Sequence, residues 1–466
     1  MSQQQSGNPY TRGMAEFVAG LTYDAIPADV IQRVKLLMLD ALGCGIYGAR
    51  LEWSQILQNM LRGIDSTRTC RVWGTNQRLS APHSTLVNGT QVQGFELDDG
   101  HHRGHIHVGS VVLPALMAVI ETKPGISGKE FLAAAVAGYE TGPRVGNCMN
   151  PEHIAQGWHS AATVGVFSAA SAAARALKLN ADKTVHALGI AGTQAAGLMA
   201  AQYGAMVKRM HAGRASQSGL YGALLAEQGF TGITSVFESE YGGFCTTFSR
   251  SQDRFKIKEL TAGLGSEWET FNTSLKFYSC VFSNHNALDA LRVIQRERPF
   301  KAADVEKVVI HGAQITVDHV GWKYKPEGMT SAQLNMPFCV ATLILEGDVF
   351  VDQFNDDSVI TDPARMALAD KVEVINDPAI TAAGAKERFT LRVQVFFKDG
   401  TMIERTGKTE RANKNNFATE QVVVDKFDKL TRHALPQKQR DELRDAVLGL
   451  EKLDDAGKLA GLLGVA

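Results

Sequence analysis

The chain lacks the features that mark several large classes of protein. Its six cysteines are scattered through 466 residues without a CxxC pair, which fits reduced, buried thiols better than a disulfide framework. No apolar run is long enough to span a membrane, and the opening residues MSQQQSGNPY are polar, so nothing in the sequence directs export. Lys and Arg (48) nearly balance Asp and Glu (49), which leaves no general positive field for nucleic acid or an anionic membrane. We therefore expect a cytoplasmic protein with no nucleic-acid or membrane partner.

What the sequence has is an ordinary globular composition, with 44% hydrophobic and 21% charged residues and enough length for two or three domains. A helical pattern begins near Pro27, and the first half is rich in Ala, Gly and Leu with few charges. Such segments predict helices that are buried on most sides, because small residues let backbones approach closely. The expected buried helices cover residues 128–141, 160–178, 182–202 and 214–228.

The pattern changes near residue 275. A β-branched run over 305–317 and an alternating run over 389–397 predict strands, and Asp399-Gly400 predicts a tight turn into 401–406. We therefore expect an antiparallel sheet with one covered face. The predicted fold is mainly α with a smaller α+β domain. Its expected parts are a disordered N-terminal tail over 1–13, a helical domain over 14–272, an α+β domain over 273–410, and C-terminal helices over 411–466 that return to the helical domain.

The stretch ELDDGHHRGHIHVGS concentrates groups that can carry chemistry. It contains three carboxylates and four histidines, namely Glu96, Asp98, Asp99, His101, His102, His105 and His107. Histidine titrates nearest to neutral pH, and a neighbouring carboxylate can fix its tautomer and raise its basicity, so the cluster can transfer protons. A metal site and a loop of solvated histidines are the two alternatives, although the spacing matches no specific zinc signature.

Three further segments carry candidate residues. His159 stands ahead of an Ala-rich helix, where a capping or core role is the alternative to catalysis. Lys208, Arg209, His211 and Arg214 precede a helix expected to begin near Ser216; cations beside the unpaired amides of a helix start form a receptor for carboxylate or phosphate, and a charged surface turn is the alternative. Lys276, Tyr278 and His285 lie at the border between the helical and mixed parts, where active sites often occur.

Several motifs together resemble the MmgE/PrpD family over roughly residues 14–450. They are ELDDGHHRGHIHVGSVVLPALMAV, GWHSAATVG, KRMHAGRASQSGLYGALLAEQGFTG, FESEYGGF, LGSEWE, LKFYSCVFSNH and AQLNMPFCVATLILEGDV, in the order and approximate spacing of the family. Its members include 2-methylcitrate dehydratases, cis-aconitate decarboxylases and iminodisuccinate epimerases. The resemblance implies a homodimer with a large all-helical domain and an α/β-sandwich lid domain. It also implies an active site in the cleft between them, without a metal or an organic cofactor.

The resemblance also implies roles for individual residues. The catalytic positions fall on Asp98, Asp99, His107, His159, Lys208 and His285, and the substrate-binding positions on Glu96, His102, Arg209, His211, Arg214, Lys276 and Tyr278. We expect His107 or His159 to abstract a proton next to a carboxylate, Asp98 or Asp99 to orient an imidazole, and Lys208 with Arg209 or Arg214 to hold substrate carboxylates. His285 would protonate the leaving group or product.

The sequence departs from the family pattern at a few positions, which bear on substrate identity. Glu96 and Gly100 replace Asp and Thr of decarboxylase-like members, Val108 and Ser279 replace prolines, and the histidine loop is one residue longer. The expected function is a cofactor-independent hydro-lyase of the 2-methylcitrate dehydratase kind acting on a small hydroxy di- or tricarboxylate. The alternatives are an epimerase of an iminodisuccinate-like dicarboxylate, a cis-aconitate decarboxylase, a metal-dependent hydrolase built on the histidine cluster, and a carboxylate-binding protein that has lost catalysis.

Overall fold

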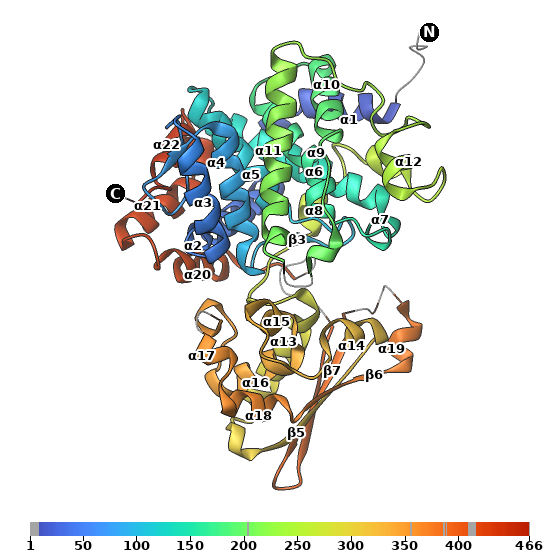
Figure 1. Ribbon diagram of the computed structural model, residues 1–466, viewed down its shortest axis with the longest axis vertical. Coiled ribbons are helices and arrows are strands. Elements are labelled where there is room, and N and C mark those ends of the chain that lie inside the picture. The colour runs from blue at the N-terminus through green and yellow to red at the C-terminus, as the bar shows by residue number, and fades with distance from the viewer. Residues whose placement is uncertain are drawn as a thin grey trace. The chain divides into compact units, whose positions relative to one another are not determined.

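The computed structural model describes residues 9–202, 205–354, 357–384, 387, 389–408 and 416–465, and the chain forms two units (Figure 1). The first, which we call the helical unit, comprises Met1–Gly94, Asp98–Leu275 and Ala418–Ala466. The second, which we call the mixed unit, comprises Phe95–Leu97 and Lys276–Phe417.

The helical unit is built mainly from long helices packed side by side. They are α1 (Pro9–Gly20), α2 (Ala28–Gly48), α3 (Glu52–Ile64), α4 (Ala81–Val92), α5 (Gly109–Thr122), α6 (Gly128–Met149), α9 (Gly165–Ala176), α10 (Ala181–Gly192), α11 (Val207–Glu227), α20 (Glu420–Thr431) and α21 (Gln437–Leu448). Short helices are α7 (Glu152–Ala155), α8 (Ser160–Thr163), α12 (Phe244–Ser249) and α22 (Gly457–Gly461). Two strand pairs, β1 (Cys70–Arg71) with β2 (Arg78–Leu79) and β3 (Gly100–His101) with β4 (Thr273–Ser274), interrupt the otherwise all-helical unit.

Local sequence signals set several helix ends. Ser127 and Glu130 form a reciprocal capping box at the start of α6, and the Asn180 side chain accepts from the Lys183 amide at the start of α10. Helix α6 continues beyond the expected end at residue 141 to Met149. The expected helix over 160–178 is divided at Val164 into α8 and α9, and α11 starts nine residues before Ser216.

The expectation of a disordered N-terminal tail over 1–13 is wrong for residues 9–13. Residues 1–8 lie outside the described chain, but residues 9–13 belong to α1. Thr11 is buried and its hydroxyl donates to the Glu238 carboxylate at 2.5 Å, which ties this helix to the body of the unit.

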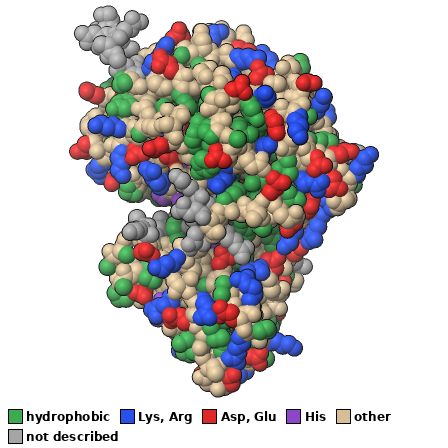
Figure 2. Space-filling view, turned by 180° about the vertical axis from the view of Figure 1, so that it is seen from behind, with side chains coloured by type: hydrophobic (Ala, Val, Ile, Leu, Met, Phe, Trp, Pro, Cys, Tyr) green, Lys and Arg blue, Asp and Glu red, His purple; other side chains and the backbone are tan. Residues whose placement is uncertain are grey.

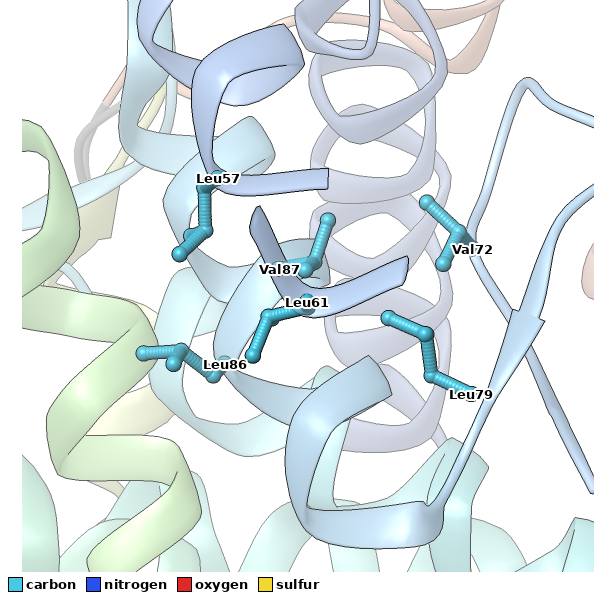
Figure 3. Packing of buried hydrophobic residues seen from close by; sticks show 6 residues of the cluster. All are labelled: Leu57, Leu61, Val72, Leu79, Leu86 and Val87. Carbon is cyan, nitrogen blue, oxygen red and sulfur yellow. The ribbon is translucent and has the colours of Figure 1, made fainter. Parts of the chain in front are cut away.

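An apolar cluster packs against the helix that carries part of the candidate site. Its side chains come from α3, α4 and the β1–β2 pair, namely Leu57, Leu61, Val72, Leu79, Leu86 and Val87 (Figure 3). Met210 of α11 packs against this cluster. The cluster therefore fixes the turn of α11 that also contains Lys208, Arg209 and His211.

The mixed unit contains a four-stranded sheet in the order β6-β5-β7-β8, from β5 (Val305–Gly312), β6 (Val372–Asn376), β7 (Leu391–Phe397) and β8 (Met402–Gly407). Buried and half-buried residues alternate along β7, as expected for a sheet with one covered face. The β5–β7 and β7–β8 pairs are antiparallel, whereas β6 is parallel to β5, so the expected purely antiparallel sheet is wrong at this edge. The helices are α13 (Phe282–Glu297), α14 (Gln314–Val320), α15 (Met329–Leu334), α16 (Met336–Glu346), α17 (Asp357–Ile360), α18 (Pro363–Ala369) and α19 (Pro378–Ala382).

The strand expected over 305–317 ends early. β5 stops at Gly312, and Ile315 and Val317 lie in α14. Thr316 and Val320, four residues apart, are the buried side chains of that helix, so its apolar spacing follows a helical period that a β-branched composition conceals.

Three features of the described residues relate to the composition. All six cysteines are buried and unpaired as disulfides. None of the described helices is long and apolar enough to cross a membrane. Figure 2 shows Lys and Arg interspersed with Asp and Glu over the visible face of each unit, in keeping with the balanced charge.

Candidate active site

The histidine-rich stretch folds into a tight loop that leads into α5. His101 in β3 donates its amide hydrogen to the Ile106 carbonyl at 2.8 Å, and His105 adopts φ 49°, the left-handed conformation that such a reversal needs. The loop separates the histidines by burial, since His101 is buried whereas His102, His105 and His107 are half-buried. Burial therefore distinguishes His101 from the other three histidines of the loop.

His107 is held by backbone and side-chain oxygens of the two aspartates. Its Nδ1 lies 2.7 Å from the Asp99 carbonyl oxygen and 3.2 Å from Asp98 Oδ2. A carbonyl oxygen only accepts, so Nδ1 carries the hydrogen and the lone pair of the neutral ring is on Nε2. The imidazole is 22% exposed, whereas the Asp98 carboxylate is 1% exposed. This arrangement gives His107 a fixed tautomer, an adjacent negative charge and access to solvent, which are the requirements of a general base.

Asp99 caps the first turn of α5 from a fully buried position. Its two carboxylate oxygens accept from the Gly109 amide at 3.1 and 3.0 Å, and the Tyr139 hydroxyl donates to Oδ2 at 3.0 Å. Burial, followed by the charge of Asp98, raises the pKa of Asp99 to about 7. Burial also raises the pKa of Tyr139 well above its usual range, so this hydroxyl stays a donor. Asp99 therefore holds and orients the loop. Because its pKa is about 7, its carboxyl group gains and loses a proton near neutral pH.

The raised pKa of Asp99 predicts a pH dependence of stability. Between pH 4 and 7 the folded protein binds a proton at Asp99 that the unfolded chain has lost, so the free energy of unfolding falls as pH rises, by about 1.4 kcal/mol per pH unit at most. Asp99→Asn mimics the protonated acid and should flatten this slope in urea titrations at successive pH values. The same slope in Asp99→Asn and in a control, Asp182→Asn at an exposed position, would contradict the prediction.

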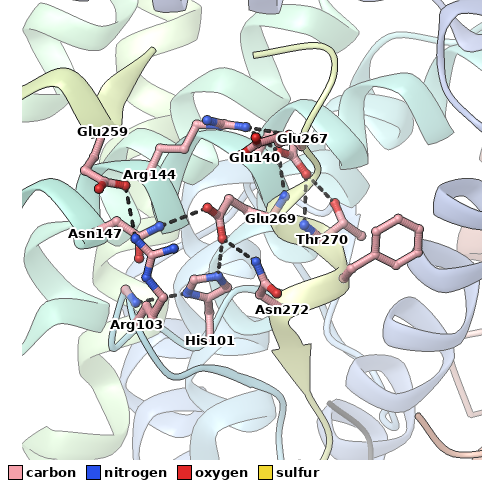
Figure 4. A network of polar contacts seen from close by, with 12 residues as sticks. His101, Arg103, Glu140, Arg144, Asn147, Glu259, Glu267, Glu269, Thr270 and Asn272 are labelled. Carbon is pink, nitrogen blue, oxygen red and sulfur yellow. Dashed lines mark hydrogen bonds and ion pairs between the residues drawn. The ribbon is translucent and has the colours of Figure 1, made fainter. Parts of the chain in front are cut away.

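His101 belongs to a buried structural network rather than to the solvent-accessible part of the site (Figure 4). Its Nδ1 accepts from the Gly104 amide at 3.0 Å, so Nε2 carries the hydrogen and donates to Glu269 at 2.8 Å. Burial lowers the pKa of His101, which keeps the ring neutral. Burial alone would raise the pKa of Glu269, but hydrogen bonds from His101 and Asn272 lower it to about 2. The network clamps the β3–β4 pair and thereby the base of the His107 loop.

His159 and His211 form a second pair of imidazoles in the helical unit. Their Nδ1 atoms lie 2.8 Å apart, with ring centroids separated by 5.0 Å. Two ring nitrogens at this distance share one hydrogen, so one ring donates and the other accepts. Burial, followed by the charge of Lys208, lowers the pKa of His211 and favours its neutral form. The pair can therefore pass a proton and still present Nε2 of His159 as either acid or base.

The cationic segment lies inside α11 rather than ahead of it. The amides of Lys208 and Arg209 donate to the Ala205 and Met206 carbonyls at 3.1 and 2.9 Å. The expected anion receptor made of unpaired amides is therefore wrong, because a tight first turn occupies them. What places a cation in the site is the side chain of Lys208 beside His211. Arg209 is buried with its guanidinium 5.5 Å from the Trp53 ring, and the exposed Arg214 bonds to Gln217.

The two groups of candidates are held on neighbouring helices. A Cβ added to Gly89 of α4 would lie 2.6 Å from Gly213 Cα and 2.9 Å from the Ser110 carbonyl oxygen, so α5 and α11 meet α4 at this point. Ser110 is three residues after His107, and Gly213 is two residues after His211. The Ser216 hydroxyl also donates to the Val111 carbonyl at 2.7 Å. Close packing through glycine thus brings the His107 loop and the His159–His211 pair to the same end of the helical unit.

The mixed unit contains the other predicted residues. Lys276 is 1% exposed, and its Nζ lies 3.2 Å from Glu96 Oε2 and 5.1 Å from the Phe282 ring centre. Tyr278 donates to Asp289 at 2.6 Å. His285 Nε2 lies 3.2 Å from the Cys280 carbonyl oxygen, so Nε2 carries the hydrogen, and its ring packs between Tyr278 and Phe282.

Sequence reasoning missed four residues that support the site. Tyr139 and Glu269 contact the loop directly, and Asp40 pairs with Lys426 beneath it. Asp40 is the one charged residue of the buried apolar run LLMLDALG, and Lys426 lies between the buried Val423 and Phe427 of α20. A single charge on the apolar face of a helix is the signal that would have revealed them.

The donor arrangement gives the metal-dependent alternative no support. Within the described residues, no group of three or more His, Cys, Asp or Glu side chains is placed to hold a metal ion. The reason is visible in the loop, where His101 turns to Glu269 and His107 to the Asp99 carbonyl. His102, the remaining predicted binding residue of the loop, is half-buried in the turn after β3.

Comparison with known proteins agrees with these motifs. The MmgE/PrpD N-terminal domain matches residues 12–256, and the MmgE/PrpD C-terminal domain matches residues 278–452. Similar proteins include the cis-aconitate decarboxylase-like protein oryM of Aspergillus oryzae, 34% identical over 97% of both chains, and a cis-aconitate decarboxylase of Aspergillus terreus, 32% identical over 97% of this chain and 95% of the relative. The 2-methylcitrate dehydratase of Escherichia coli is 23% identical over 79% of this chain and 78% of the relative.

These matches define the class of protein as an enzyme of the lyase type. The chain belongs to the MmgE/PrpD family, which confirms the resemblance in the sequence.

Proposed function

We propose that the protein is a cofactor-independent lyase acting beside a carboxylate of a small di- or tricarboxylate, with His107 as the group that transfers the proton. The observation that carries this proposal is the His107 imidazole, whose Nδ1 is fixed by the Asp99 carbonyl and the Asp98 carboxylate while its Nε2 holds the lone pair. Lys208, beside His211, supplies a positive charge for a substrate carboxylate.

The first candidate reaction is decarboxylation of a substrate of the cis-aconitate kind. It is favoured over dehydration because the relatives named as decarboxylases are 32–34% identical across the chain, against 23% for the bacterial dehydratase. The C–C bond to one carboxyl group breaks and carbon dioxide leaves. The electron pair moves through the adjacent double bond to the carbon next to another carboxylate, which then takes a proton from a protonated imidazole. This reaction needs one acid and a clamp for the remaining carboxylates.

Dehydration of a 2-methylcitrate-like substrate is the second candidate. One group removes the proton next to a carboxylate and another protonates the departing hydroxide. The helical unit contains both kinds of group, because His107 can act as the base and the His159–His211 pair can deliver a proton. We further propose, from the resemblance, that the enzyme is a homodimer; its buried thiols favour a cytoplasmic location.

Proton NMR in deuterium oxide tests these reactions together. Chelator-treated protein is incubated with cis-aconitate, 2-methylcitrate, citrate, tartrate and iminodisuccinate stereoisomers. Loss of a carboxyl carbon with deuterium in the product supports decarboxylation, and new olefinic signals support dehydration. Exchange with stereochemical scrambling would indicate an epimerase instead. Turnover that appears only after a divalent ion is added would refute the cofactor-independent proposal.

A further inference from the structure

A buried group of charges lies beneath the His107 loop. Asp40, Asp98 and Asp99 are each 0% exposed, and Lys426 is 3% exposed. Lys426 Nζ lies 2.5 Å from Asp40 Oδ1, which links α20 to α2 across 386 residues of sequence. Three carboxylates and one lysine are therefore buried in this region, where each uncompensated charge is costly.

The packing of α2 brings the Asp40–Lys426 pair next to the loop. A Cβ added to Gly109 would lie 2.8 Å from the Ala41 side chain and 3.1 Å from Asp99 Oδ2, so the residue after Asp40 contacts the residue that Asp99 caps. Burial alone would lower the pKa of Lys426, but Asp40, Cys44 and Asp98 together raise it. Lys426 thus senses Asp98 as well as Asp40.

Among these buried carboxylates of the described chain, Asp98 lacks hydrogen-bond donors. Within the described residues, neither of its side-chain oxygens accepts a hydrogen bond, although the carboxylate is fully buried. His107 Nδ1 lies 3.2 Å from Asp98 Oδ2. The positive charge of this buried group is that of Lys426, whose pKa Asp98 helps to raise.

We propose that the Asp40–Lys426 ion pair is a positioning element that sets the net charge beneath His107 and so determines how readily this imidazole accepts a proton. The proposal rests on the role of His107 in the proposed function. In the intact protein Asp40 and Lys426 cancel each other. Burial raises the pKa of Asp99 to about 7, and the Asp98 carboxylate lies 3.2 Å from His107, with Cys44 and Tyr139 as neighbours whose pKa values burial raises well above their usual ranges.

Substitution of either partner should change this balance in opposite directions. Asp40→Asn removes one negative charge and keeps that of Lys426, so it should move the titration midpoint of His107 to lower pH. Lys426→Met removes one positive charge and keeps that of Asp40, so it should move the His107 midpoint to higher pH. Each shift in the His107 midpoint should be on the order of 1 pH unit, as expected when one buried charge near an imidazole is removed. The double variant removes both charges and should titrate close to wild type.

Titration of the unliganded protein by NMR of 13C-labelled histidine tests the proposal without a substrate. His107→Asn assigns the signal by its disappearance. Lys35→Met is a matched control, because Lys35 also lies on α2 and pairs with the C-terminal segment, at 3.1 Å from Glu451. It should lower stability yet leave the His107 midpoint unchanged.

The outcomes separate the two proposals. Opposite shifts in the single variants with restoration in the double variant support the positioning role. If Lys426→Met does not fold, a lowered midpoint in Asp40→Asn that returns in the double variant supports it equally. Midpoints that stay at the wild-type value, or that move in the same direction in both single variants, overturn it. Failure of the proposed function would appear separately, as absence of turnover in the wild-type substrate panel while the titration still shows the shifts.

Discussion

Replacing His107 with Asn is expected to lower kcat by about 10²–10⁴-fold, the range over which a positioned acid or base contributes. Asparagine keeps a donor near the position of Nδ1, so the hydrogen bond to the Asp99 carbonyl can persist, but it removes Nε2 and with it the group that transfers the proton. KM should change little because Lys208, the residue that we propose to bind a substrate carboxylate, is unchanged. The measurement is steady-state turnover of the substrate identified by NMR, together with circular dichroism of the variant.

A matched control exists within the same unit. His83 also has Nδ1 close to an aspartate, Asp65 Oδ2 at 2.8 Å, but it lies at the start of α4 among the bonds that hold Ser80. His83→Asn should retain wild-type kcat. Loss of activity in both variants would point to a general effect of breaking a histidine–aspartate pair and not to catalysis by His107.

The second large effect is expected for Lys208. Lys208→Met removes the cation beside His211 and keeps the length of the side chain, so it should lower kcat/KM by about 10²–10³-fold through loss of a charge that stabilises the developing enediolate. Lys208→Ala should abolish measurable turnover while the fold persists, because the turn that carries Lys208 is anchored by Met210 in the apolar cluster.

Lys123→Met provides the comparison for Lys208. Lys123 is a partly exposed cation of the same unit, paired with Glu227 at 2.9 Å. An exposed ion pair contributes at most about 1 kcal/mol to stability, so the variant should stay folded. Because Lys123 is not a residue of the candidate site, its loss should leave kcat/KM within about twofold of wild type. Near-normal activity in a folded Lys208→Met protein would refute the proposal that Lys208 binds a substrate carboxylate.

The sequence predicted the parts of the fold in which one residue pattern dominates. Small residues indicated buried helices, alternation in 389–397 indicated β7, and Asp399-Gly400 indicated the β7–β8 turn, where Gly400 has φ 83°. It failed where two patterns overlap. The β-branched residues Ile315 and Val317 favour a strand by composition, but the burial of their neighbours follows a helical period.

The candidate site was predicted to the extent that its residues are close in sequence. Asp98, Asp99 and His107 share one loop, and their contacts follow from that loop. The His159–His211 contact and the Asp40–Lys426 pair join distant segments, and a single sequence contains no spacing that predicts them. The division of the histidines also escaped prediction, because only the contact with Glu269 shows that His101 is structural.

The helical unit is completed by chain that lies beyond the mixed unit in sequence, since α20 from the C-terminal segment packs on α2 from the N-terminal part. During synthesis the ribosome releases α2 some 370 residues before α20, and for that interval the apolar face of α2 that α20 will cover has no native partner. Until then α2 has only its earlier partners, such as α4, α5 and α6. Closing so large a loop late also makes docking of α20 a candidate for the slow step of folding. Because Lys426 arrives with that helix, the unit acquires its buried counter-charge, and with it the final environment of His107, only when α20 has docked.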